Sequence, residues 1–135
     1  MSKSELSDLS RINLTDDKDQ IINKIKKAKT DTLPLPATSA DLEKRPEAKN
    51  LIGIYSSLTN NTFQKSIDEF AGKNFSEFKE KLSEKLVNVI NPISLKIKDL
   101  LNDKVFLEKI LKDGCEKAND IASKKVKEIH KIVGF

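Results

Sequence analysis

Apolar residues recur at three- to four-residue spacing along most of this chain, which is the pattern of one face of a helix. The pattern predicts a helix beginning near Thr15-Asp16, a second over 46–59, and a third that Thr62 caps and Gly72 ends. The second would begin at Pro46, since a missing N–H costs nothing at a first helical position. The expected buried faces are formed by Ile21, Ile22, Ile25, Ala28, Ala48, Leu51, Ile52, Tyr55, Leu58, Phe63, Ile67 and Phe70.

The longest apolar stripe begins at Ser76 and keeps one register to Leu101. Pro92 lies inside it and is expected to kink or split the helix. A further helix is expected after a turn at 102–103, with Gly114 as the candidate break before the last one. Cys115 and His130 are interpreted as a buried structural thiol and a partly buried bystander. The Phe residues 63, 70, 75 and 78 are interpreted as core rather than as a base-stacking platform.

No run of four or more residues alternates with period two, so no sheet is predicted. The expected fold class is all-α: a bundle of five to six helices preceded by a loop. We expect residues 1–15 to be that loop and residues 16–135 to be the helical domain. Residues 30–45 are expected to be a linker within it, because Pro34 and Pro36 exclude a helix there.

The composition excludes some classes of function but does not identify the function. Of 135 residues, 37% are apolar and 34% charged, as in a soluble globular domain. The net charge of +4 is compatible with a nucleic-acid partner but does not establish one. The single Cys excludes an intrachain disulfide and indicates a reducing compartment, and no secretory signal opens the chain, so we expect a cytoplasmic protein. One His and one Cys cannot complete a structural zinc site, so no metal site is predicted.

The lysine clusters at 24–29 and 124–131 allow two interpretations. Most such clusters are solvated helix faces, but positive charge along a helix is also what a phosphate backbone requires. No nucleophile or acid–base pair is evident. Taken alone, the pattern therefore favours a basic helical interaction module.

The order of short motifs gives a different indication. The chain opens Met1-Ser2-Lys3-Ser4, which resembles the second signature of class I aminoacyl-tRNA synthetases, Lys-Met-Ser-Lys-Ser, without its first Lys. Within that class the continuation is similar to the tryptophan–tRNA ligases, although Glu5-Leu6 replace a usual Asp-Pro. The matching segments are 14–16 (LTD), 25–31 (IKKAKTD), 50–59 (NLIGIYSSLT), 71–79 (AGKNFSEFK), 91–93 (NPI) and the tail from Gly114 to Phe135.

The resemblance implies the C-terminal portion of such a ligase, beginning inside the ATP-binding loop. It implies that Met1, Ser2, Lys3 and Ser4 contact ATP, which comes with Mg²⁺, and that Lys3 is catalytic. It implies that the helical domain recognises tryptophan tRNA, with Lys24, Lys26, Lys27 and Lys73 as candidate contacts. The N-terminal catalytic domain, which carries the usual homodimer surface, would be missing, so the chain alone is expected to be inactive. A helical interaction module unrelated to aminoacylation is the alternative.

Overall fold

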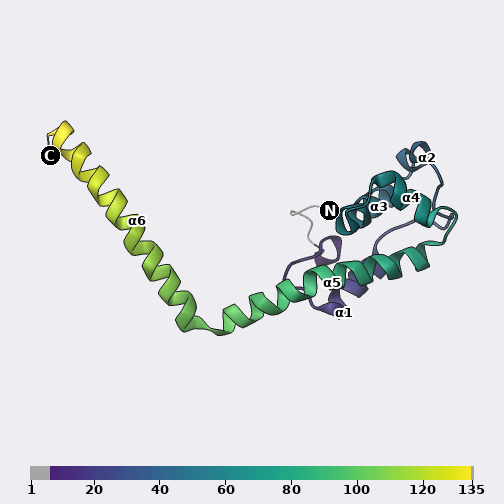
Figure 1. Ribbon diagram of the computed structural model, residues 1–135, viewed down its shortest axis with the longest axis horizontal. Coiled ribbons are helices and arrows are strands. Elements are labelled where there is room, and N and C mark those ends of the chain that lie inside the picture. Colours follow the sequence, from purple (N-terminus) through teal and green to yellow (C-terminus); the bar gives the residue numbers. More distant parts are fainter. Residues whose placement is uncertain (1–6, 135) are drawn as a thin grey trace. The chain divides into compact units, whose positions relative to one another are not determined.

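The computed structural model describes residues 7–134, and all regular structure in that range is helical (Figure 1). The predicted all-α class is therefore confirmed. The chain divides into two units, Met1–Leu95 and Lys96–Phe135, and the division falls within one long helix. The elements of residues 7–134 are the 3₁₀ turn η1 (Asp8–Ser10) and the helices α1 (Lys18–Lys27), α2 (Ser39–Glu43), α3 (Pro46–Thr59), α4 (Phe63–Phe70), α5 (Phe75–Asn102) and α6 (Lys104–Val133).

Local sequence sets the helix ends of the first unit. Helix α1 begins after Asp17, whose carboxylate accepts the backbone N–H of Gln20, while the Gln20 side chain accepts the Asp17 N–H. The cap therefore lies one residue beyond the predicted start at Thr15-Asp16. Pro46 occupies the first position of α3 and Thr62 caps α4, and both predictions are confirmed.

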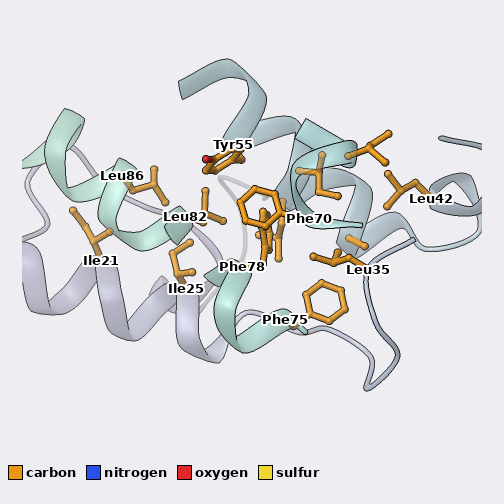
Figure 2. Close-up of a cluster of buried hydrophobic side chains, with 14 residues drawn as sticks. Ile21, Ile25, Leu35, Leu42, Tyr55, Phe70, Phe75, Phe78, Leu82 and Leu86 are labelled. Carbon is orange, nitrogen blue, oxygen red and sulfur yellow. The ribbon is translucent and has the colours of Figure 1, made fainter. Parts of the chain in front are cut away.

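Aromatic rings from α3, α4 and α5 form the centre of the core (Figure 2). The rings of Tyr55 and Phe70 meet edge to face with centroids 4.9 Å apart, and Phe70 and Phe78 do so at 4.8 Å. Ile21 and Ile25 bring α1 onto the same core. The interpretation as core is confirmed for Phe70, Phe75 and Phe78, while Phe63 is partly buried and packs against the core. The buried apolar residues are Ile21, Ile25, Leu35, Leu42, Ala48, Leu51, Ile52, Tyr55, Ile67, Phe70, Phe75, Phe78, Leu82 and Leu86.

Residues 30–45 are packed against this core, although a linker is predicted there. Leu35 and Leu42 are buried. The N–H of Leu35 donates to the carbonyl of Lys73 at 2.8 Å, and the N–H of Gly72 donates to the carbonyl of Leu35 at 2.9 Å. The backbone of Gly72 has a φ of +75° in this arrangement, which glycine adopts freely and which would be strained for most other residues. The prolines prevent a helix only around themselves, and α2 forms directly after them.

Helices α5 and α6 are each continuous over their whole length. Helix α5 is not split at Pro92, and the predicted break of α6 at Gly114 is wrong. A proline removes one backbone hydrogen bond, and a helical glycine costs only about 1 kcal/mol relative to alanine. Either cost is small beside the bonds retained in helices of 28 and 30 residues.

The second unit buries none of its described residues, 96–134. The interpretation of Cys115 as a buried thiol is wrong, because the residue is exposed. His130 is exposed as well, rather than partly buried. Helical periodicity identifies the apolar face of α6, but it contains no information on whether another segment covers that face.

Candidate functional site

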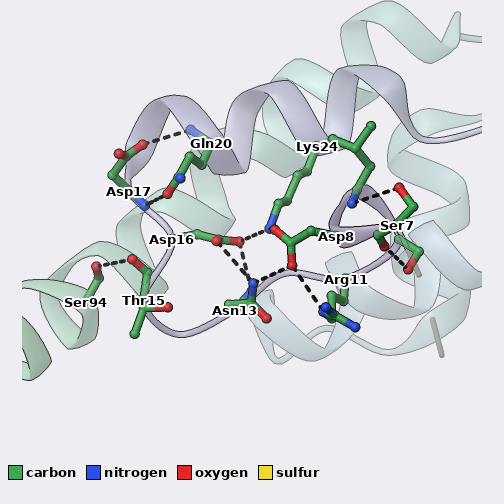
Figure 3. Close-up of polar contacts among 12 residues, drawn as sticks. Ser7, Asp8, Arg11, Asn13, Thr15, Asp16, Asp17, Gln20, Lys24 and Ser94 are labelled. Atoms are coloured by element: carbon green, nitrogen blue, oxygen red, sulfur yellow. Dashed lines mark hydrogen bonds and ion pairs between the residues drawn. The ribbon is translucent and has the colours of Figure 1, made fainter. Parts of the chain in front are cut away.

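Residues 7–16 join the first residues of the chain to α1. Apart from the single turn η1 they have no regular structure, and Ser7 caps that turn by accepting the N–H of Leu9 at 3.3 Å. Within the described residues, the bonds between backbone groups of this segment join residues three apart. The position of the segment therefore depends on its side chains, and Figure 3 shows them gathered around Lys24 of α1.

Lys24 is the centre of this polar cluster. Its Nζ donates to Asp16 Oδ2 and to Asp8 Oδ2, both at 2.7 Å. Asn13 also takes part, because its backbone N–H donates to Asp16 Oδ2 at 2.8 Å and its side-chain Nδ2 donates to Asp8 Oδ1 at 2.9 Å. Arg11 Nε donates to the same Asp8 Oδ1 at 3.1 Å. Lys24 is only 6% exposed. A buried ammonium is tolerated only where carboxylates compensate for its lost hydration, and both carboxylates here come from the segment before α1.

The protonation states reinforce these contacts. The hydrogen bond from Lys24, followed by that from Asn13, lowers the pKa of Asp8 from 3.8 to about 2. Burial lowers the pKa of Lys24, but its hydrogen bonds to Asp16 and Asp8 outweigh that effect and raise the pKa above 10.5. Asp8 is therefore a carboxylate and Lys24 an ammonium throughout the neutral range.

Helix α5 holds α1 near both of its ends. The hydroxyl of Ser94, which is buried, donates to the carbonyl of Thr15 at 3.2 Å. The ammonium of Lys79 donates to the carbonyl of Ala28 at 2.7 Å, where the dipole of α1 favours a positive charge. Burial lowers the pKa of Lys79. The two α5 residues are about 22 Å apart at the usual rise per helical residue, so α1 is fixed along its length.

A groove of about 1120 Å³ lies beside these contacts and is lined by residues of α1, α5 and the segment between α1 and α2. Lys18, Lys26 and Lys79 line it, and so do Asp31, Glu80 and Glu84. The two signs of charge are balanced, so the groove by itself selects neither an anionic nor a cationic ligand.

The residues predicted to form the site have different environments in the structure. Met1, Ser2, Lys3 and Ser4 lie outside the described residues. Lys26 and Lys27 are exposed on α1, and Lys73 donates to Glu77 at 2.8 Å. Lys24 does not fit the predicted phosphate contact, because its ammonium is buried between two carboxylates.

Sequence reasoning missed two long-range contacts at this site, those of Asp8 with Lys24 and of Lys79 with the Ala28 carbonyl. Asp8 and its partner Lys24 are 16 residues apart, and Lys79 lies 51 residues from Ala28. No periodicity connects residues at such separations. Within residues 7–134 no three His, Cys, Asp or Glu side chains gather where a metal ion would bind. No helix in that range is long and apolar enough to span a membrane.

Comparison with known proteins identifies relatives along the whole chain. The family model described as tRNA synthetases class I (W and Y) matches residues 1–91. Tryptophan–tRNA ligases from Agrobacterium fabrum and Rickettsia felis are each 49% identical over all 135 residues, and that from Rhizobium meliloti is 44% identical. The chain spans 38% of the length of the Agrobacterium and Rhizobium relatives and 40% of the Rickettsia one.

The family match covers most of the chain, including η1, α1 to α4 and the first part of α5. It therefore includes both the polar cluster around Lys24 and the aromatic core. On this evidence the chain belongs to the family of class I tRNA synthetases for tryptophan and tyrosine.

Proposed function

We propose that this chain acts as part of a tryptophan–tRNA ligase, as the portion that joins the ATP-binding loop to a helical tRNA-binding domain. The observation that carries this proposal is the 49% identity to a tryptophan–tRNA ligase over all 135 residues. An unrelated interaction module is not favoured, because the similarity covers every element. The cytoplasm is the proposed compartment, and the intact enzyme is proposed to be a homodimer through surfaces outside this chain.

In this proposal residues 1–15 are the ATP loop and the end of the catalytic fold, within the C-terminal portion of the ligase. Met1, Ser2, Lys3 and Ser4 are the proposed ATP contacts. Charge builds on the departing pyrophosphate when tryptophan is activated, and an ammonium at that position stabilises the transition state more than the ground state. This is the role proposed for Lys3. We propose no ligands in this chain for the Mg²⁺ expected with ATP, because no three His, Cys, Asp or Glu side chains within residues 7–134 gather in a way that could hold a metal ion.

The helical domain, residues 16–135, is the proposed tRNA-binding part. Lys26 and Lys27 are the proposed phosphate contacts on α1, because both side chains are exposed. Lys26 also lines the groove, and Lys27 is the next residue of the same helix. Lys73 is proposed as a third contact, which requires its ammonium to leave Glu77. Lys24 is omitted from this set, since its charge is already neutralised.

The first test restores an intact enzyme by replacing the matched 38% of the Agrobacterium fabrum ligase with this chain. The chimera should catalyse tryptophan-dependent exchange of pyrophosphate into ATP and should charge tryptophan tRNA, whereas the chain alone should do neither. Lys3→Ala in the chimera should raise the barrier to adenylate formation by about 3–4 kcal/mol with little change in tryptophan binding. Exchange by the chain alone, or equal effects of Lys3→Ala on tryptophan affinity and rate, would contradict the proposal.

The second test concerns the tRNA surface. Binding of tryptophan tRNA to the chimera should weaken as salt rises, with a log–log slope of about 0.7–0.9 for each phosphate neutralised. Replacing Lys26 and Lys27 with Gln should flatten that slope, while the same change at Lys109 and Lys112 of α6 should not. An altered anticodon should weaken binding by roughly 1–3 kcal/mol for each lost base contact. Equal affinity and charging for both tRNAs would exclude anticodon recognition by this domain.

A further inference from the structure

We propose that Arg45 is a positioning residue for the groove beside α1 and α5: it holds and neutralises the Asp31 carboxylate, so that a phosphate of the tRNA can approach Lys26. This inference rests on the proposed function, in which Lys26 contacts the tRNA backbone. Asp31 and Lys26 both line the groove, whereas Arg45 does not. Arg45 therefore acts on the bound tRNA through Asp31 and is not itself proposed to touch it.

Arg45 lies at the start of α3 and binds the segment that follows α1. Its Nε donates to Asp31 Oδ2 at 2.7 Å, and its Nη2 donates to Asp31 Oδ1. Two parallel hydrogen bonds of this kind make the pair of a guanidinium and a carboxylate strong. The same guanidinium donates from Nη1 to the Pro34 carbonyl at 2.6 Å and from Nη2 to the Leu33 carbonyl at 3.0 Å. One side chain therefore fixes both the carboxylate and the backbone beside it.

The pair of Arg45 and Asp31 is partly shielded from water on the side of Arg45. The Arg45 side chain is 16% exposed, and its Cζ lies 5.5 Å from the centre of the Phe75 ring. Phe75 is itself buried and lines the groove. The hydrogen bond from Arg45 is the main cause that lowers the pKa of Asp31. At neutral pH, Asp31 is therefore a carboxylate whose charge Arg45 compensates.

This compensation changes which ligand the groove can accept. Three lysines and three acidic residues line it, and these are Lys18, Lys26, Lys79, Asp31, Glu80 and Glu84. With Arg45 included, four cations face three carboxylates, and the balance becomes positive. Lys79 covers a second source of negative potential, because it donates to the Ala28 carbonyl at the end of α1. Within residues 7–134 no carboxylate pairs with the exposed Lys26 ammonium, so its charge is available to a phosphate.

The experiment measures the affinity of the chimeric enzyme for tryptophan tRNA. Arg45→Gln leaves Asp31 as an uncompensated carboxylate in the groove, and should weaken binding about 10-fold at about 0.1 M salt. The control is Lys49→Gln in the first turn of α3, which removes the same charge and breaks the ion pair of Lys49 with Glu43. Because Lys49 does not line this groove, the control should weaken binding less than about twofold.

A double variant separates the charge of Asp31 from the structural contacts of Arg45. Arg45→Gln also removes the hydrogen bonds to Leu33 and Pro34, so a loosened segment alone could weaken binding. Arg45→Gln combined with Asp31→Asn lacks the same hydrogen bonds but also lacks the repelling carboxylate. The double variant should therefore recover most of the affinity that Arg45→Gln loses, even if the Tm of both variants is lowered.

Three results would overturn the role of Arg45. The first is a double variant that binds as weakly as Arg45→Gln, and the second is an Arg45→Gln variant that binds as tightly as the Lys49→Gln control. The third concerns a tRNA with an altered anticodon. Contacts to phosphates contain no base information, so Arg45→Gln should weaken binding of both tRNAs by the same factor. A loss confined to tryptophan tRNA would assign Asp31 to a base instead of a phosphate.

Failure of the proposed function would give a different result. An unmodified chimera that does not bind tRNA would overturn that function. An unchanged salt slope after Lys26 and Lys27 are replaced with Gln would overturn the phosphate contact on which this inference rests. If the unmodified chimera binds tRNA and the lysine variant flattens the slope, the comparison of the Arg45→Gln, double and Lys49→Gln variants tests Arg45 alone.

Discussion

Residues 7–95 and residues 96–134 are both helical and both amphipathic, yet they use their apolar side chains in opposite ways. In the first range, α1, α3, α4 and α5 enclose three aromatic rings, and the charged residue Lys24 is itself buried together with Asp16. In the second range, α6 leaves Val105, Ile121 and Ile132 more than two-thirds exposed.

The difference is one of connectivity rather than of composition. Turns and short segments after α1, α3 and α4 return the chain to the same place, so several apolar faces meet. A single long helix cannot cover its own apolar stripe, because its side chains point outward around the axis. Packing in the first unit should therefore contribute most of the tertiary stability of this chain. The stability of the second unit should come mainly from the backbone hydrogen bonds of its helix.

The largest expected effect tests that assignment directly. Phe78→Ala removes a fully buried ring that packs against Phe70, and should lower the free energy of unfolding by about 3–5 kcal/mol in urea denaturation. The matched change Phe106→Ala on α6 should cost about 0.5 kcal/mol or less, since surface substitutions rarely exceed that. Equal losses at the two positions would mean that Phe106 is packed as tightly as Phe78, and would contradict this assignment of stability to the first unit.

A slightly smaller effect is expected at the buried cation. Lys24→Met should lower the free energy of unfolding by about 3 kcal/mol, because Asp16 would remain buried without its partner. Lys27→Met, at an exposed position of the same helix, is the control and should be nearly neutral. If both variants unfold at the same urea concentration, the cluster around Lys24 contributes nothing to stability.

The contacts of Lys24 also predict how the stability of the protein depends on pH. The pKa of Asp8 is lowered from 3.8 to about 2, so its contribution to stability is present above pH 3.8 and is lost as the pH falls toward 2. The raised pKa of Lys24 acts in the opposite direction: its contribution is present below pH 10.5 and is lost at higher pH. Carboxyl titration by NMR should find Asp8 near pH 2 in the unmodified chain and closer to 3.8 in Lys24→Met. The same titration midpoint in both chains would show that Lys24 is not the cause.

The smallest expected changes in stability come from replacing one glycine in each unit. No atom lies within 4 Å of a Cβ built on Gly114, so Gly114→Ala should stabilise α6 by about 0.5–1 kcal/mol. Gly72 has φ +75°, so Gly72→Ala should destabilise the first unit by about 1 kcal/mol. Thermal unfolding followed by circular dichroism should move in opposite directions for the two variants. A shift in the same direction would contradict this difference in backbone conformation.

Sequence reasoning succeeded where structure depends on neighbouring residues. The start of α3 at Pro46 and the cap of α4 at Thr62 are local features, because each satisfies or removes backbone N–H groups within one turn. The aromatic cluster was predictable for the same reason, since its members occupy the apolar faces of those helices. The start of α1 differs by one residue because Asp16 faces Lys24 instead of capping the helix.

The predictions that failed concern contacts between distant residues or the strength of a local signal. The packing of Leu35 could not be foreseen, because its backbone partners are at 72–73. Gly114 is predicted to break the last helix, but a helix of 30 residues tolerates one glycine. Helix α5 likewise continues through Pro92 without splitting, whereas the kink also expected there stays a prediction. The motif at residues 1–4 and its proposed ATP contacts stay a prediction, since they lie outside the described residues.

The sequence alone determined that the chain forms helices, which face of each is apolar, and which family it resembles. Tertiary structure decided which of those faces are covered and which charges are neutralised. It left Cys115 exposed and buried Lys24, the reverse of what each residue's own stretch of sequence suggested. The physical reason is that burial is a property of what lies opposite a side chain, and for Lys24 the two residues opposite are 8 and 16 positions away.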